Sequence, residues 1–282
     1  FTLWRSRSVN SGVINGLALG LVGPEAAEIN GLALGLGVSS GKRTRGVTLG
    51  ILGSGSGGDM YGVNFGGLGV GAGGDLWGLN IGGLGVGGGG TVSGISFGIL
   101  GVGAGDGING LAIGGLGAGT GGDVNGIIIG GFGCGAGGDA TGILLGGFGV
   151  GAGGNATGLL LGGIGVGAGK TLKGFGFGLV GVGAGKQIRG GALAGAMIKT
   201  PKFHGIGAAS YMRVDHFKGI SLAGVTNYES SRGLSIALVN VAKELHGVQL
   251  GLINYAGNNK FLKFFPIINT CLLYTSDAAD ES

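Results

Sequence analysis

Residues 62–77 read G-V-N-F-G-G-L-G-V-G-A-G-G-D-L-W, and residues 78–93 repeat the pattern as G-L-N-I-G-G-L-G-V-G-G-G-G-T-V-S. The glycine that opens each copy, here called the anchor glycine, recurs every 16 residues from Gly62 to Gly190. So constant a period predicts one structural unit copied in series, with each copy burying apolar surface against its neighbours.

The spacing of the anchor glycines divides the chain into zones. Residues 1–45 carry irregular early copies, residues 46–200 form the glycine-rich array with its 16-residue period, and residues 201–270 continue with a period of 14. Residues 271–282 break the repeat, and the string over residues 271–281 resembles a translated sequencing adapter. We expect this tail to be foreign and, since the chain begins without Met, both natural ends to be missing.

Composition excludes two classes of repetitive protein. Glycine accounts for 79 of 282 residues, but only 3 prolines and no three-residue period rule out collagen. A charged fraction of 11% and a mean hydropathy of +0.52 argue against a disordered chain. Outside the tail the single cysteine, Cys134, takes the place that Val150 has in the next copy, so we predict a small buried apolar side chain there.

Apolar residues alternate within each copy, as in a β-strand that packs one face. Val63 and Phe65 follow the anchor by one and three places, whereas Leu68 and Val70 follow it by six and eight. The parity changes across a Gly-Gly pair, where glycine permits a corner. Each copy is therefore predicted to contain two short strands and two glycine-rich turns, and the 14-residue copies to lose two residues from the second turn.

Two all-β architectures fit this unit. The first is a repeat β-solenoid in which each 14–16-residue copy forms one coil of a parallel stack. The alternative is an antiparallel outer-membrane β-barrel or pore, because a ten-residue segment such as residues 79–88 is long enough to span a membrane as a strand. The parity change in mid-segment and the equivalence of all the turns favour the solenoid. Helices are disfavoured, since each interior glycine costs about 0.5–1 kcal/mol relative to alanine.

The C-terminal copies carry a resemblance to a known family. Residues 233–240 (G-L-S-I-A-L-V-N), residues 247–254 (G-V-Q-L-G-L-I-N) and the terminal F-P-I-I-N at residues 265–269 resemble the short-repeat surface proteins of Gram-negative bacteria, the Leptospira-type surface-repeat family that is also common in gut Bacteroidota. The resemblance covers about 70 residues. It implies a location at the bacterial cell surface, in the outer membrane or outside the cell, and no known catalysis. It supplies no binding residues.

Asp59, Asp75, Asp123 and Asp139 occupy one place in their copies. Aspartate at a turn commonly accepts hydrogen bonds from backbone N–H groups, which is the structural interpretation. The functional alternative is a calcium-binding edge, because stacked carboxylates repel one another unless a cation lies between them. Ca²⁺ is the one cofactor that the pattern suggests.

Tyr61 and Trp77 share the place before the anchor glycine, where other copies have Asn, Thr, Lys or Arg. So varied a position is typical of a water-facing side chain. Two neighbouring aromatic rings at this position could also stack on a sugar ring, so Tyr61 and Trp77 are the candidate carbohydrate-binding residues.

The distribution of charge points to the expected partners. Between Gly46 and Gly169 the only charged residues are five aspartates, so the outer surface of the array is weakly charged. Such a surface is suited to contact with the same surface of a second copy, with a surface polysaccharide or with a lipid membrane. Open strand edges predict end-to-end self-association as well. The basic segments lack interleaved aromatic residues, so no nucleic acid is expected. We predict a non-enzymatic structural or adhesive surface protein, a rigid scaffold that makes weak contacts in series.

Overall fold

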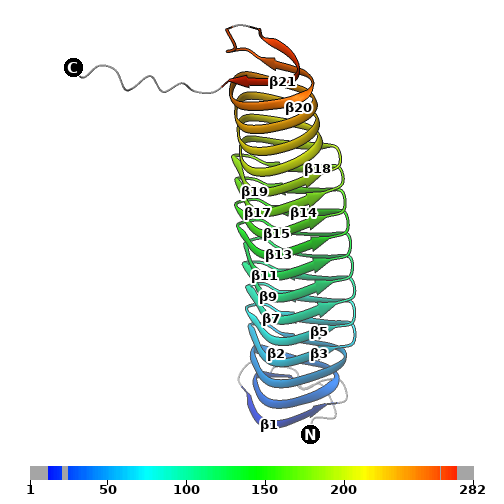
Figure 1. Ribbon diagram of the computed structural model, residues 1–282. Coiled ribbons are helices and arrows are strands. Elements are labelled where there is room, and N and C mark those ends of the chain that lie inside the picture. The colour runs from blue at the N-terminus through cyan, green and yellow to red at the C-terminus, as the bar shows by residue number, and fades with distance from the viewer. Residues whose placement is uncertain (1–11, 21–24, 261, 272–282) are drawn as a thin grey trace, which may run out of the picture. The chain divides into compact units, whose positions relative to one another are not determined.

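The computed structural model describes residues 12–20, 25–260 and 262–271, and all the regular structure in these ranges is β-strand (Figure 1). The chain divides into two compact units, Phe1–Leu159 and Leu160–Ser282, which are described separately below. Among the described residues, no helix is long and apolar enough to cross a membrane.

Long strands alternate with short ones along most of the chain. In unit 1 they are β1 (Val13–Gly20), β2 (Glu25–Ser56), β3 (Asp59–Gly66), β4 (Gly69–Ala72), β5 (Leu76–Gly82), β6 (Gly85–Gly88), β7 (Thr91–Gly98), β8 (Gly101–Ala104), β9 (Gly107–Gly114), β10 (Gly117–Thr120), β11 (Asp123–Gly130), β12 (Gly133–Ala136), β13 (Ala140–Gly146) and β14 (Gly149–Ala152). β15 (Ala156–Gly162) contains the division between the units. Unit 2 continues with β16 (Gly165–Ala168), β17 (Thr171–Gly178), β18 (Gly181–Ala184), β19 (Gln187–Ala194), β20 (Met197–Ala256) and β21 (Phe264–Cys271).

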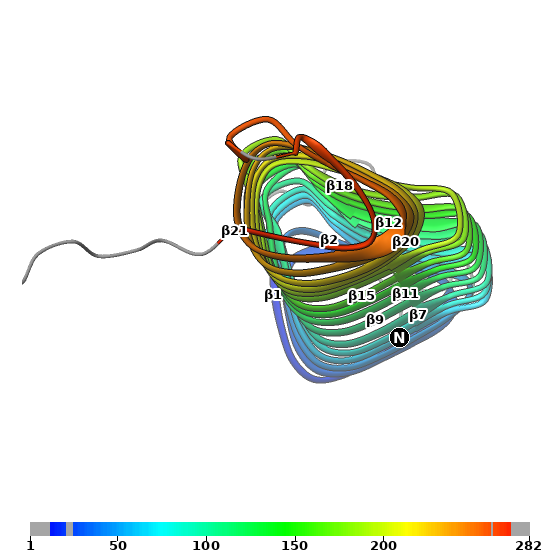
Figure 2. The ribbon, with the colours of Figure 1, turned by 45° about the horizontal axis from the view of Figure 1, so that its top comes forward.

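Each 16-residue copy forms one coil of a parallel β-solenoid. β3 pairs in parallel with β5, and β4 pairs in parallel with β6, so that each residue lies beside its equivalent in the next coil. Figure 2 shows the coils of each unit stacked on one another. An up-and-down barrel requires antiparallel neighbours. The predicted solenoid is therefore confirmed, and the barrel alternative is wrong.

The two strands and two glycine turns predicted for each copy are also confirmed. β3 has eight residues and β4 has four, with one bend at residues 67–68 and another at residues 73–74. The anchor Gly62 has a φ of +118°, and a Cβ atom there would overlap the carbonyl oxygen of Gly46 in the preceding coil. Only glycine satisfies both constraints, which explains why the period is marked by this residue.

The alternation of apolar residues leaves open which face of each strand is inside, and the structure decides it. The buried positions lie two residues before and two after the anchor, as at Met60 and Asn64, together with Val70 in the short strand. Val63 and Phe65 point outward and are 40% and 41% exposed. Asn64 Nδ2 donates a hydrogen bond to Asn80 Oδ1 of the next coil at 2.8 Å, so this pair links successive coils inside the stack, although Asn64 Oδ1 is buried without a hydrogen-bond partner.

The 14-residue coils of β20 are shortened at both corners. In the 16-residue coils the short strand buries the residues eight and ten places after the anchor, as at Val182 and Ala184. In β20 the buried positions come seven and nine places after it, as at Thr226 and Tyr228. From the last of these buried residues to the first buried residue of the next long strand there are four places in a 16-residue coil, as from Ala184 to Ile188, but three in β20, as from Tyr228 to Ser231. Each of the two corners is therefore one residue shorter in β20. The prediction that the second turn alone loses two residues is wrong.

The last strand reverses direction and caps unit 2. β21 pairs antiparallel with the end of β20, with Gly247 opposite Cys271 and Asn254 opposite Phe265. Asn254 Nδ2 donates to the carbonyl oxygen of Phe265 at 3.1 Å. The F-P-I-I-N segment is thus a capping strand, and the edge of β20 that was predicted to be open is covered. The remainder of the expected foreign tail, residues 272–282, lies outside the described residues.

Candidate functional surface

The row of aspartates lies where the second turn leads into the next long strand. Asp59 Oδ1 accepts a hydrogen bond from the backbone nitrogen of Asp75 at 3.1 Å. Asp75, Asp123 and Asp139 repeat the contact with backbone nitrogens one coil further on, at 2.6–2.8 Å. The structural interpretation of these residues is confirmed, with the N–H groups coming from the neighbouring coil.

The same geometry bears on the calcium hypothesis. Thr91 and Gly107, which pair in register, separate Asp59 and Asp75 from Asp123 and Asp139. Within the ranges that the structure describes, no group of three or more His, Cys, Asp or Glu side chains gathers closely enough to hold a metal ion. Ca²⁺ binding stays a prediction, and any such site would have to share carboxylates that already bind backbone N–H groups.

Tyr61 and Trp77 are neighbours in register on β3 and β5. The hydroxyl of Tyr61 donates to Asp59 Oδ2 at 3.3 Å, and its ring lies 5.7 Å from the guanidinium carbon of Arg45. Tyr61 is thus half-buried in a polar cluster that also contains an ion pair between Arg43 and Asp59, with 4.0 Å between the nearest nitrogen and oxygen atoms. Trp77 remains 47% exposed, and sugar binding at these two rings stays a prediction.

Cys134 lies inside unit 1, in register with Ala118 and Val150. Burial raises the pKa of its thiol to about 11. A thiol held neutral in this way is a poor nucleophile. The prediction of a small buried apolar residue at this position is confirmed.

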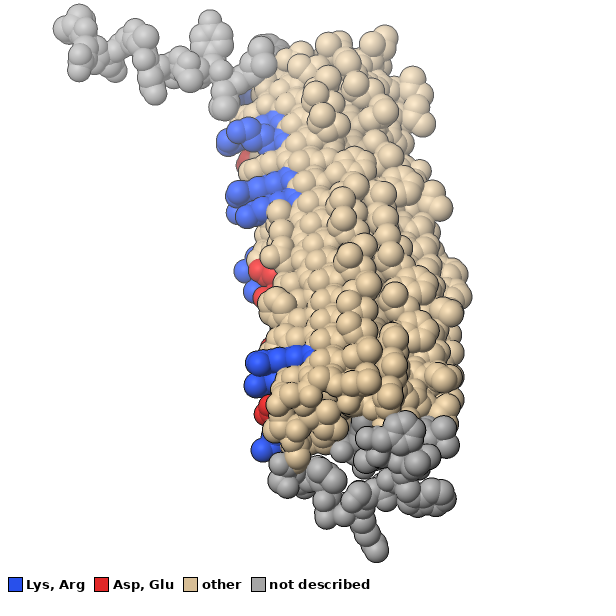
Figure 3. All heavy atoms as spheres, turned by 90° about the horizontal axis from the view of Figure 1, so that it is seen from below, with Lys and Arg blue, Asp and Glu red and all other residues tan. Residues whose placement is uncertain are grey.

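The most extensive surface feature is related to the weak charge that the sequence predicts for the array, but its position within each coil was not predicted. The eight residues that begin with each anchor glycine, such as residues 62–69, contain no Asp, Glu, Lys, Arg or His in any copy. We call this segment the apolar half-coil. All the charged side chains of the repeats lie in the other half of the coil. Within each unit, Figure 3 shows charged side chains along one edge while the rest of the visible described face is uncharged. Aligning the copies and marking charge would have revealed this division.

Apolar side chains project outward from this half-coil in every copy of the array. In unit 1 the exposed fractions of Val63, Phe65 and Leu68 are 40%, 41% and 54%. Phe132 and Phe148 stack on adjacent coils with 5.2 Å between ring centroids, although both are more than half exposed. Soluble monomers rarely expose continuous apolar surface on this scale, so the half-coil is the strongest candidate for a contact surface.

The fold defines the chain as a parallel β-solenoid repeat protein. Comparisons with protein-family models, with curated proteins and with solved structures find no match. The resemblance of the C-terminal copies to bacterial surface repeats therefore stays a prediction.

Proposed function

We propose that this chain is a non-enzymatic structural and adhesive repeat protein of the bacterial cell envelope. Its function lies in the repeated outer surface of the coils. One observation carries the proposal: equivalent side chains of successive coils pair in register, so one kind of side chain is presented again and again along a surface. Rows of identical weak contacts gain affinity through multivalency, which suits adhesion.

The scaffold role is supported by the way the coils are joined. Backbone pairing links each strand to its equivalents on both sides, as β7 is linked to β5 and β9. Hydrogen bonds inside the stack extend the connection to side chains, because Asn80 Nδ2 donates to Ser96 Oγ at 3.2 Å. A chain built in this way holds its outer rows at fixed spacing, which a serial binding surface requires.

The envelope location rests on the resemblance of residues 233–269 to surface repeats. Antibodies raised against the purified chain test it on cells that naturally produce the protein. Labelling of intact cells, and loss of that labelling after external protease treatment, is the expected result. Labelling that appears only after lysis would contradict the envelope location. An internal cytosolic protein labelled in parallel provides the control for cell integrity.

A further inference from the structure

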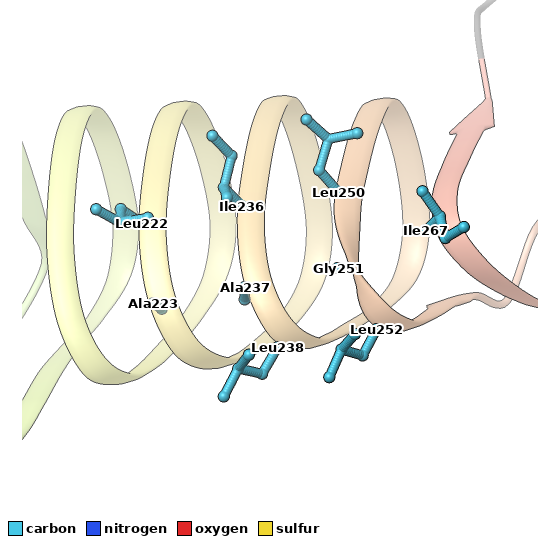
Figure 4. A pocket seen from close by; sticks show the side chains of 9 residues that line it. All are labelled: Leu222, Ala223, Ile236, Ala237, Leu238, Leu250, Gly251, Leu252 and Ile267. Atoms are coloured by element: carbon cyan, nitrogen blue, oxygen red, sulfur yellow. The ribbon is translucent and has the colours of Figure 1, made fainter.

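An apolar groove lies across the half-coils of β20. It has a volume of about 480 Å³. Figure 4 shows leucine and isoleucine side chains on its two sides with small residues between them, and Ile267 of β21 at one end. The sides are formed by Leu222, Ile236 and Leu250 facing Leu238 and Leu252. Leu222, Leu238 and Leu252 are 58%, 61% and 70% exposed, so the groove is open to the surroundings rather than part of the core.

A row of cations borders the apolar half-coils of unit 2. It consists of the residues directly before the anchor glycines, which point outward on the same strand face as the first apolar residue of each half-coil. Lys173 pairs in register with Arg189, and Arg189 with His204. Lys218 and Arg232 follow at the 14-residue spacing and are exposed. No copy anywhere in the chain has Asp or Glu at this position.

These cations are not neutralised by neighbouring carboxylates. Within the described ranges the two ion pairs are Arg43 with Asp59 and Lys243 with Glu229, and neither includes a member of the row. Partial desolvation and then the charge of Arg189, followed by other nearby cations, lower the pKa of His204, so its imidazole is uncharged at neutral pH. The positive charge of the row is carried by Lys173, Arg189, Lys218 and Arg232. The row is therefore a strip of uncompensated positive charge beside an apolar surface.

We propose that unit 2 binds the surface of an anionic lipid bilayer through its apolar half-coils and this cationic row. Apolar side chains such as Leu238 and Leu252 enter the boundary between headgroups and acyl chains, while Lys218 and Arg232 reach the lipid phosphates. Long basic side chains place an aliphatic stem on apolar material and the charge at the headgroups. Anionic lipids attract each such cation.

Charge complementarity favours a bilayer over a second copy of the chain as the occupant. A second copy presents the same half-coil, which contains no Asp or Glu, and the same cationic row. The carboxylates of β20, at Asp215, Glu229 and Glu244, follow the anchor glycines by ten or eleven places and so lie outside the half-coil. An anionic bilayer supplies both the apolar layer and the negative charge that this surface lacks.

Vesicle flotation with the purified full-length chain tests the proposal. The chain is mixed with vesicles of phosphatidylglycerol and phosphatidylcholine, and separately with vesicles of phosphatidylcholine alone. We expect flotation with the anionic vesicles that weakens as salt is added. Leu238→Ser combined with Leu252→Ser should weaken binding more than about tenfold. Arg232→Gln should weaken it about fivefold, and the matched control Lys243→Gln, outside the row, should bind as the wild type does.

Circular dichroism establishes that each variant is folded. Should the double variant unfold, Leu252→Ser alone replaces it. Failure of the wild-type chain to float with anionic vesicles, or flotation of the leucine variant equal to wild type, would overturn the proposal. So would a wild-type dimer that the leucine substitutions convert to a monomer without any flotation, because the half-coils would then pack against a second copy. Since only purified chain and synthetic lipid are used, a negative result leaves the envelope location to its own test.

Discussion

Asp123 Oδ1 lies 2.7 Å from the backbone nitrogen of Asp139, the equivalent residue of the next coil. Asp139 in turn accepts from the backbone nitrogen of Asn155 at 2.6 Å. A side chain thus continues the coil-to-coil hydrogen bonding at the point where the chain leaves the second turn. The repeated aspartate is explained by this contact without any ligand.

Replacing Asp123 with alanine should destabilise unit 1 modestly. The N–H group of Asp139 loses its acceptor, and because this group is near solvent we expect a cost of about 1 kcal/mol. Asp123→Asn keeps an acceptor oxygen and should lose less. Urea unfolding followed by circular dichroism measures both changes. Equal losses in the two variants would show that the charge, rather than the hydrogen bond, matters at this position.

If the aspartates act only as acceptors for backbone N–H groups, calcium should leave the melting temperature unchanged. A bound cation stabilises the native state by mass action, but the Oδ1 atoms of Asp59 and Asp123 are already engaged by backbone N–H groups. Thermal unfolding in excess Ca²⁺ and in chelator makes the comparison. A higher melting temperature in Ca²⁺ that disappears in Asp123→Asn would instead establish a calcium site on the acidic row.

An alanine at an anchor glycine should be far more damaging than one at a glycine of a short strand. Gly142 has a φ of +127°, and a Cβ there would overlap the carbonyl oxygen of Gly126. We expect Gly142→Ala to cost on the order of 3 kcal/mol. Nothing lies within 4 Å of a Cβ built on Gly151, so Gly151→Ala is the matched control and should change stability by less than about 1 kcal/mol. Similar urea midpoints for the two variants would refute the steric explanation of the period.

Asn240 should be the most sensitive polar residue in the interior of β20. Its Nδ2 donates to Asn254 Oδ1 at 2.8 Å and to the carbonyl oxygen of Leu250 at 3.0 Å, while its Oδ1 accepts from Thr226 at 2.8 Å. Asn240→Ala leaves several buried groups unpaired, at about 1–3 kcal/mol for each. Asn227→Ala, at an exposed position of the same strand, should have little effect. Comparable losses at both sites would contradict the buried ladder.

Cys134 should make the protein sensitive to alkali. Burial raises the thiol pKa from 9.0 to about 11, so between these values the unfolded chain has released a proton that the folded chain retains. The contribution of the Cys134 thiol to the free energy of unfolding is therefore fully present below pH 9.0 and is lost as the pH rises toward 11. Cys134→Val, which copies the equivalent Val150, should remove this part of the loss while leaving neutral stability intact. Parallel alkaline profiles for the two proteins would show that Cys134 does not contribute.

Much of the unit was predictable because its determinants are local. A glycine held at positive φ against the preceding coil tolerates no side chain, so Gly62 and its equivalents repeat visibly in the sequence. The corner between the strands is marked by a Gly-Gly pair, and Asp75 and Cys134 occupy places whose repetition indicates turn and interior. A constraint that acts on one residue and its equivalent in the next coil makes the same residue type recur in every copy, so it can be read from the sequence.

The features that the sequence did not predict, above all which side chains are inside the coil, depend on how each coil closes. Alternation in residues 62–70 indicates that Val63 and Phe65 share a face, but it does not state which face is inside. The inward face is decided by which side chains meet when two strands and two corners close into one coil. In this structure Met60, Asn64 and Val70 are the buried residues. The corners that shorten in β20, the antiparallel cap and the apolar half-coil beside its cationic row likewise depend on residues brought together across coils. The period is thus a property of the chain, whereas the inside and outside of the solenoid arise only from tertiary structure.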